Sequence, residues 1–195
     1  LAASCVRAAA DGMTVHTRSE KVERCRKTLT ELLLADYPAE SLREQTTGDD
    51  LLLALARRYG LRQDALALPR GNGRPQDSSS PVIAVDHAAC ILCDRCIRAC
   101  DEIQHNDVIG RAGKGYTTRI AFDLDSPMGK STCVACGECA SVCPTGALTH
   151  KPLTVPIRPR AELKSVDSVC PYCGVGCAVT LHVDPQKNAV VLVDG

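Results

Sequence analysis

Residues 90–100 read Cys90-Ile-Leu-Cys93-Asp-Arg-Cys96-Ile-Arg-Ala-Cys100, and residues 133–144 read Cys133-Val-Ala-Cys136-Gly-Glu-Cys139-Ala-Ser-Val-Cys143-Pro144. Both runs have the spacing C-x2-C-x2-C-x3-C. In this pattern three thiolates hold one iron–sulfur cluster, and the fourth, on the helix that follows, reaches a second cluster. We therefore expect two 4Fe–4S clusters with exchanged ligands. One is assigned to Cys90, Cys93, Cys96 and Cys143, and the other to Cys133, Cys136, Cys139 and Cys100.

Two other uses of these cysteines compete with clusters. Paired C-x2-C motifs can form a tetrahedral zinc site, but such a site leaves the third and fourth cysteine of each run unexplained. Disulfides fit poorly, because repeated cysteines three residues apart are typical of metal-binding loops and the total of 13 cysteines is odd. The two runs, closed by Cys143-Pro144-Thr145-Gly146-Ala147-Leu148, resemble bacterial two-cluster ferredoxin domains, which implies an α+β fold for this region.

Composition limits the other function classes. With 23 basic and 23 acidic residues there is no net field to attract nucleic acid or anionic lipid, so neither is an expected partner. No apolar run approaches the roughly 20 residues that a membrane span needs. One Phe, four Tyr and no Trp limit the apolar core, so metal ligation should contribute to folding. Abundant thiolate ligands favour a reducing compartment, and we expect a cytoplasmic protein.

A third cysteine motif lies near the end of the chain. Cys170-Pro-Tyr-Cys173-Gly-Val-Gly-Cys177 has the spacing C-x2-C-x3-C and offers three thiolates, so a fourth ligand would come from beyond Gly195. A zinc knuckle is the alternative from spacing alone. The two glycines favour a cluster, because they let backbone N–H groups approach sulfide. Strands are expected at residues 178–183 and 189–193, joined by a hairpin loop.

The first 60 residues are expected to be mostly helical. A short strand is expected at residues 13–16, and a capping box, Thr17-x-x-Glu20, starts a helix that ends near Asp36. Its apolar face should contain Val22, Cys25, Leu29, Leu32 and Leu33. Cys25 is therefore interpreted as a core thiol rather than a ligand. A second helix is expected from residues 48–50 to Gly60.

Other segments read as connections. Residues 69–81 are Gly-, Ser- and Pro-rich and read as a linker, followed by a strand at 82–85. Gly110 to Gly115 lack the spacing of a phosphate loop and are expected to form a hairpin turn before Tyr116 to Leu124. Residues 151–160 contain three prolines and read as an extended connector.

The order of these motifs resembles the N-terminal iron–sulfur region of the alpha subunit of soluble NAD-linked molybdopterin formate dehydrogenases, which is related to the complex I large subunit. The stretches that carry the resemblance are CILCDRCIRACDEIQ, STCVACGECASVCPTGAL and VCPYCGVGC. The resemblance implies six successive parts. They are the end of a 2Fe–2S domain (1–17), a helical spacer (18–68), a linker (69–81), a two-cluster ferredoxin domain (82–150), a connector (151–164) and the start of a molybdopterin oxidoreductase domain (165–195).

The resemblance also implies further cofactors. Cys5, in the stretch LAASC, would be the fourth ligand of a 2Fe–2S cluster whose other ligands lie upstream. Cys170, Cys173 and Cys177 would hold a third 4Fe–4S cluster beside a bis-pterin molybdenum or tungsten centre. Many relatives have His-Pro followed by three cysteines where this chain has Tyr37-Pro38 and no cysteine before Cys90, so that additional cluster is expected to be absent.

The function implied is electron relay in formate oxidation. In the family, formate is oxidised at the pterin-bound metal, and electrons pass along the clusters to a flavin subunit that reduces NAD. The implied partners are flavin/NAD-binding and 2Fe–2S subunits, and no catalytic residue is assigned to this segment. Alternatives are another molybdopterin enzyme such as a nitrate reductase, a complex I large subunit, a stand-alone ferredoxin-type carrier, or a zinc-binding structural module.

Overall fold

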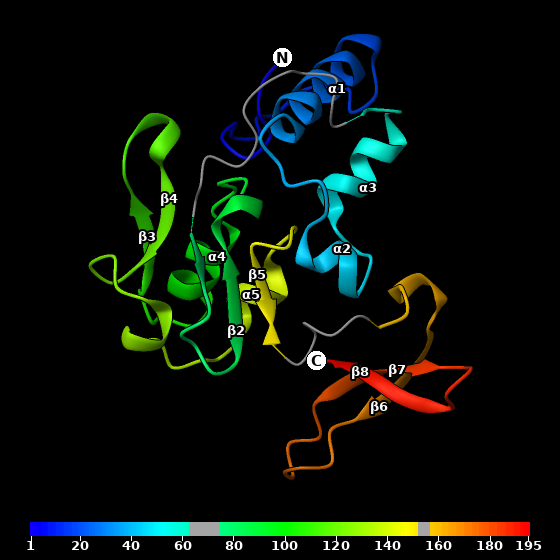
Figure 1. The fold of residues 1–195 in the computed structure, drawn as a ribbon. Helices are drawn as coiled ribbons and strands as arrows, with labels where there is room; N and C mark the ends of the chain where they lie inside the picture. The colour runs from blue at the N-terminus through cyan, green and yellow to red at the C-terminus, as the bar shows by residue number, and fades with distance from the viewer. Residues whose placement is uncertain (63–74, 152–156) are drawn as a thin grey trace.

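The computed structural model describes residues 1–62, 75–151 and 157–195. It is a mixed helix-and-sheet fold, drawn in Figure 1. The α-helices are α1 (Glu20–Leu34), α2 (Leu42–Thr46), α3 (Leu51–Arg58), α4 (Arg95–Arg98) and α5 (Glu138–Val142). The strands are β1 (Gln76–Asp77), β2 (Ile83–Asp86), β3 (Ile109–Ala112), β4 (Arg119–Phe122), β5 (Leu148–His150), β6 (Lys164–Val169), β7 (Ala178–Asp184) and β8 (Ala189–Asp194). A π-helix, η2 (Ala99–Ile103), continues α4, and short 3-10 helices occupy His87–Ala89, Gly115–Thr117, Met128–Lys130 and Arg160–Glu162.

Helix α1 forms where the sequence predicts a helix, but two details differ. The cap is Ser19 rather than Thr17, and its side chain accepts a hydrogen bond from the backbone N–H of Val22 at 3.3 Å. The buried side chains are Thr30 and Leu34. The predicted apolar face is therefore wrong: Cys25 is half-buried, and three leucines are exposed, namely Leu29, Leu32 and Leu33. Only one narrow side of the helix packs, because its partners are the short α3 and the chain after Leu34.

Helices α2 and α3 follow one another closely, and each has an N-cap residue whose side chain accepts hydrogen bonds from the first turn of its own helix. Asp50 caps α3, accepting hydrogen bonds from the backbone N–H groups of Leu52 and Leu53 at 3.0 and 3.1 Å. The helix ends at Arg58, with Tyr59 as its C-cap, and the predicted stop Gly60 follows directly with a positive φ of 61°. Helix α2 was not anticipated, because its single turn is too short to show an apolar period. Ser41 caps it through the backbone N–H of Glu44.

The ferredoxin-like unit is built on the antiparallel sheet β1-β2-β5. Strand β2 precedes the first cysteine run and β5 follows the second, with Val85 opposite Leu148. Strand β1 lies in the segment interpreted as a linker, where Gln76 pairs with Asp86 and the side chain of Asp77 accepts a hydrogen bond from the backbone N–H of Met128 at 2.6 Å. Residues 69–74 of the expected linker lie outside the described residues.

Strands β3 and β4 form a separate antiparallel hairpin beside this unit (Figure 1). The hairpin turn expected at Gly110 to Gly115 is present but begins later, after Ala112, and extends through Thr118. Strand β4 is consequently shorter than the predicted Tyr116 to Leu124. Leu124 is 97% exposed and lies in the loop beyond β4.

The C-terminal residues form a third sheet, β6-β7-β8, all antiparallel. Strands β7 and β8 agree with the prediction, and β6 was missed because every residue in it is exposed and no side shows apolar alternation. The connector docks on α2: the backbone N–H of Arg160 donates to the carbonyl oxygen of Thr47 at 2.7 Å. Residues 152–156, with two of its three prolines, lie outside the description.

The spacer helices and the ferredoxin-like unit share one hydrophobic core. Leu34, Tyr37 and Leu52 from the spacer belong to the same buried cluster as Ile83 and Leu148 from the sheet. By contrast, residues 1–16 are exposed and contain no strand. The strand predicted at residues 13–16 is therefore wrong, because a strand forms by hydrogen bonding to a partner strand and no described segment pairs with these residues.

Candidate iron–sulfur centres

The two cysteine runs fold as near copies of one another. Leu92 and Ala135, each two residues after the first cysteine of its run, have φ values of 55° and 56°. Asp94 and Gly137, each directly after the second cysteine, have φ values of 61° and 83°. These left-handed residues turn the backbone tightly, so that successive cysteines of a run face the same side. Gly137 also has no room for a side chain, because an added Cβ would lie 2.7 Å from Cε1 of His150.

Burial of the thiols follows the same order in both runs. The first cysteine is half-buried, the second is exposed, and the third and fourth are buried. The buried ones lie on the helices after each loop, at Cys96 on α4, Cys100 on η2, Cys139 on α5 and Cys143 at the end of α5. None of the thirteen cysteines, all of which lie in the described residues, forms a disulfide.

The structure gathers four thiols from both runs around one small cavity. Ile91, Pro144 and Leu148 are among its apolar walls. Burial raises the pKa of Cys96 above its usual value, and the neighbouring thiols of Cys143 and Cys90 raise it further. The four cysteines that line this cavity, called site I below, are Cys90, Cys93, Cys96 and Cys143.

A second cavity gathers the remaining four thiols of the two runs. Ile83, Val108 and Ile109 contribute to its walls. Burial raises the pKa of Cys139 to about 12, and the nearby thiols of Cys133 and Cys136 contribute. The cysteines that line this cavity, called site II below, are Cys100, Cys133, Cys136 and Cys139. Each cavity thus takes three thiols from one run and one from the other.

The donor set of each cavity fits a 4Fe–4S cluster, which takes four cysteine thiolates. The thiols line a cavity instead of closing on one point. In the part of the chain that the structure describes, no three His, Cys, Asp or Glu side chains are grouped closely enough to hold a single metal ion. A backbone N–H also points at sulfur in site II, where Val108 donates to Sγ of Cys100 at 3.4 Å. Such hydrogen bonds are typical of cluster surroundings.

Two side chains that are not cysteines fix the loop of site I from positions distant from that loop in the sequence. Arg111 on β3 binds both carboxylate oxygens of Asp94, at 2.8 and 2.7 Å, and donates to the carbonyl oxygen of Leu92 at 3.1 Å. Thr145, two residues after Cys143, donates from Oγ1 to the carbonyl oxygen of Ala89 at 2.7 Å. Sequence reasoning missed both, since neither residue belongs to the cysteine pattern.

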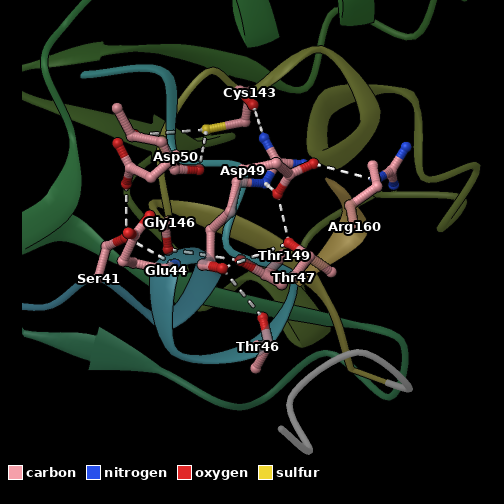
Figure 2. A network of polar contacts seen from close by, with 12 residues as sticks. Ser41, Glu44, Thr46, Thr47, Asp49, Asp50, Cys143, Gly146, Thr149 and Arg160 are labelled. Atoms are coloured by element: carbon pink, nitrogen blue, oxygen red, sulfur yellow. Dashed lines mark hydrogen bonds and ion pairs between the residues drawn. The ribbon is translucent and has the colours of Figure 1, made fainter. Parts of the chain in front are cut away.

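The spacer helices contact the chain at and directly after Cys143 through hydrogen bonds and close packing (Figure 2). Arg43 of α2 donates to the carbonyl oxygen of Cys143, and the backbone N–H of Leu51 donates to that of Pro144 at 2.9 Å. Gly146 packs so closely that an added Cβ would lie 2.8 Å from the Cβ of Ser41.

A buried polar cluster supports this contact. Tyr37 and Ser41 both donate hydroxyl hydrogens to Oδ2 of Asp50, which is fully buried. Burial raises the pKa of Tyr37, and the neighbouring Asp50 carboxylate raises it further. Tyr37 thus forms a packed polar core at the position where the resemblance would place an additional cluster.

The third cysteine motif is organised differently. It forms the loop between β6 and β7, closed by a 2.8 Å hydrogen bond from the backbone N–H of Cys170 to the carbonyl oxygen of Cys177. Cys173 and Cys177 are exposed, and Tyr172 beside them is 92% exposed. The loop brings three cysteines into one turn, and the described part of the chain places no fourth ligand among them.

Cys5 lies apart from the other candidate ligands. It is exposed, in the segment before α1 that has no regular structure. Among the described residues, nothing groups Cys5 with other metal-binding side chains.

Two stretches match known domain families. Residues 80–149 match the ferredoxin-like domain of NADH-quinone oxidoreductase subunit 3, and residues 163–195 match the molybdopterin oxidoreductase Fe4S4 domain. The chain carries two iron–sulfur domains. The first covers β2, both cysteine runs, the β3-β4 hairpin and most of β5, and the second covers β6, the Cys170–Cys177 loop, β7 and β8.

Several relatives are subunits of oxidoreductases. An NADH-quinone oxidoreductase chain of Rhizobium meliloti is 33% identical over 179 residues, covering 91% of this chain and 20% of that protein. A crystal structure of an NAD+-reducing [NiFe]-hydrogenase in its H2-reduced state superimposes with a TM-score of 0.65 at 31% identity, covering 77% of this chain and 64% of that one. The chain thus spans about a fifth of the length of the Rhizobium meliloti relative. These matches show an iron–sulfur electron-transfer segment of the complex I-like and molybdopterin type.

One matching protein is named for formate. A putative formate dehydrogenase of Staphylococcus haemolyticus is 25% identical over 205 residues, covering 85% of this chain and 20% of that protein.

Within the described residues, no helix has both the length and the apolar character that crossing a bilayer requires.

Proposed function

We propose that this chain is the electron-relay part of an NAD-linked formate dehydrogenase. The observation that carries the proposal is the grouping of four thiols around each of two cavities, with one ligand exchanged between the runs. When bound, 4Fe–4S clusters there supply one-electron transfer between a two-electron site and a distant acceptor. The protein residues hold the clusters in apolar surroundings and fix the distance between them through α4 and α5.

The outer cysteines complete the proposed relay. Cys170, Cys173 and Cys177 are proposed as three ligands of a further 4Fe–4S cluster, which sits next to a molybdenum or tungsten pterin in the parent enzyme. Cys5 is proposed as one ligand of a 2Fe–2S cluster on the side of a flavin/NAD partner. Formate as substrate is supported by the order of the three cysteine stretches and by the similarity to the putative formate dehydrogenase.

A second candidate is a complex I-like large subunit that passes electrons from NADH toward a quinone. The similarity to the NADH-quinone oxidoreductase chain of Rhizobium meliloti favours it, since the identity of 33% exceeds the 25% to the putative formate dehydrogenase.

The test is purification of the full-length native protein without oxygen, followed by metal, pterin and activity measurements. The formate dehydrogenase proposal expects molybdenum or tungsten, pterin, and formate-dependent reduction of NAD or a dye. A protein without pterin that supports electron transfer from NADH to quinone would favour the second candidate. A colourless protein that contains zinc and no acid-labile sulfide would overturn both.

A further inference from the structure

Sites I and II have almost the same backbone but different charged surroundings. The clearest difference is at the fourth ligand of each run. The carbonyl oxygen of Cys143, in site I, accepts a hydrogen bond from the guanidinium group of Arg43. The carbonyl oxygen of Cys100, in site II, accepts one from the uncharged backbone N–H of Asn106 at 2.9 Å. One fourth ligand therefore has a cation against it, and its counterpart has a neutral donor.

The positive charge of Arg43 is well placed to act. Its side chain is only 16% exposed, so solvent screens it weakly. Its counterion Asp49 lies 3.4 Å away and is shared with Arg160 at 3.2 Å, which in turn pairs with Asp194. Figure 2 shows Asp49 and Arg160 on the side of Cys143 away from Asp50. Because Asp49 divides its charge between two arginines, it neutralises Arg43 only in part.

Acidic residues flank the ligands of site II. Asp101 directly follows Cys100, and Glu138 directly precedes Cys139. Asp123 accepts hydrogen bonds from both the backbone N–H and the hydroxyl of Thr132, the residue before Cys133. In site I the loop acid, Asp94, is instead neutralised by the two-point contact with Arg111.

Reduction of a cluster adds one negative charge, so a nearby cation stabilises the reduced form and nearby carboxylates destabilise it. We propose that Arg43 holds the reduction potential of the cluster in site I above that of the cluster in site II. The proposal rests on the cluster assignment above. Arg43 is a positioning and tuning residue here, since it touches a ligand backbone and not the cluster itself.

The proposed difference in reduction potential determines at which of the two sites electrons are held. Cys143, the ligand that site I takes from the second run, lines the same cleft as Arg160 and strand β8, so this ligand lies beside the C-terminal sheet. Electrons shared between the two sites would rest mainly at site I. Arg43 would thus set the end of the ferredoxin unit at which electrons collect.

The first test is an anaerobic potentiometric measurement on the full chain, followed by electron paramagnetic resonance. Wild type should show one reduction step for each of sites I and II. The step at higher potential should persist in Cys100→Ser, which loses a site II ligand, and should disappear in Cys93→Ser, which loses a site I ligand. The opposite assignment of the two steps would overturn the proposal.

The second test uses variants of the charged residues. Arg43→Gln should move the higher step to more negative potential, by at least about threefold in the reduction equilibrium constant, and leave the lower step in place. Arg43→Lys should retain part of the effect. Asp49→Asn should move the higher step in the opposite direction, which mere loosening of the fold would not produce.

Arg57→Gln is the matched control. Arg57 lies on α3 of the same spacer, is 58% exposed and pairs with Glu44, so its removal should move neither step. Equal shifts of both steps in Arg43→Gln, or no shift, would overturn the inference. Absence of both cluster signals from wild type would instead overturn the cluster assignment, so the two failures are distinguishable.

Discussion

The ferredoxin-like unit and the C-terminal sheet both present cysteines on tight loops, but they differ in how far the thiols are buried and in how many segments contribute them. In the unit, loops from two runs close around shared cavities and half of the eight thiols are buried. In the C-terminal sheet, one loop presents three cysteines at the end of a hairpin, with Cys173 and Cys177 exposed. The comparison teaches that short spacing makes a loop able to bind metal, whereas a complete and protected site requires a second segment.

The first prediction tests the exchange of ligands between the runs and has the largest expected effect. Cys100→Ser should remove the cluster of site II and leave that of site I, because its thiol lines only the second cavity. Iron and sulfide should each fall by about four atoms per chain in anaerobically purified protein. The matched control Cys25→Ser should keep the full content. Loss of the site I signal alone would show that the ligands are not exchanged.

The second prediction concerns how the spacer protects site I. Gly146→Val should lower stability by about 1–3 kcal/mol, because the new side chain collides with Ser41 and the backbone of Leu42. Anaerobic guanidinium unfolding followed by circular dichroism measures the change. Gly110→Ala is the control, since nothing lies within 4 Å of an added Cβ there. Equal stability of the two variants would mean that the spacer does not pack against this turn.

The third prediction examines the polar core of the spacer. Tyr37→Phe should cost about 1 kcal/mol, because it removes one hydrogen bond to the buried carboxylate of Asp50. Tyr59→Phe, which removes a hydrogen bond to the more exposed Glu23, should cost less. The same unfolding measurement compares them. A larger cost for Tyr59→Phe would contradict the conclusion that the buried Tyr37–Asp50 hydrogen bond stabilises the spacer more than the exposed one.

The fourth prediction has the smallest effect and sharpens the contrast with thiols outside the unit. Cys25→Ala should change stability by less than about 1 kcal/mol and leave iron content unchanged, because Cys25 is only half-buried on α1. Iron analysis and unfolding of the same preparation check both statements. A loss of iron in this variant would place Cys25 among the ligands.

The cysteine spacing predicted the local folding of the ligand loops well. The ligand loops, the helices that follow them and strand β2 all appear close to where the sequence placed them, whereas strand β5 was not predicted. The reason is that C-x2-C-x2-C leaves few backbone paths that turn three thiols to one side. Strands β7 and β8 were predicted for a similar reason, since alternation and a turn-rich loop are local signals.

Features that depend on packing partners were predicted poorly. The face of α1 was assigned from its apolar period, but burial fell on Thr30 and Leu34, where α3 and Tyr37 lie. The strand β1 and the docking of the connector on α2 were missed, because each is stabilised by contacts with distant segments rather than by its own residues. No local pattern marks Arg43, since the cysteine it contacts is 100 residues away.

The sequence by itself determined which residues are able to bind iron and sulfide, because thiolates at fixed short spacing impose loop geometry without help from the rest of the chain. Only the tertiary structure decided which thiols share a cavity and which charges surround it. Those properties depend on α2, α3 and β3 folding against the loops and placing Arg43 and Arg111 there. Electrostatic surroundings arise from distances in space, and distances between remote segments exist only once the core has formed.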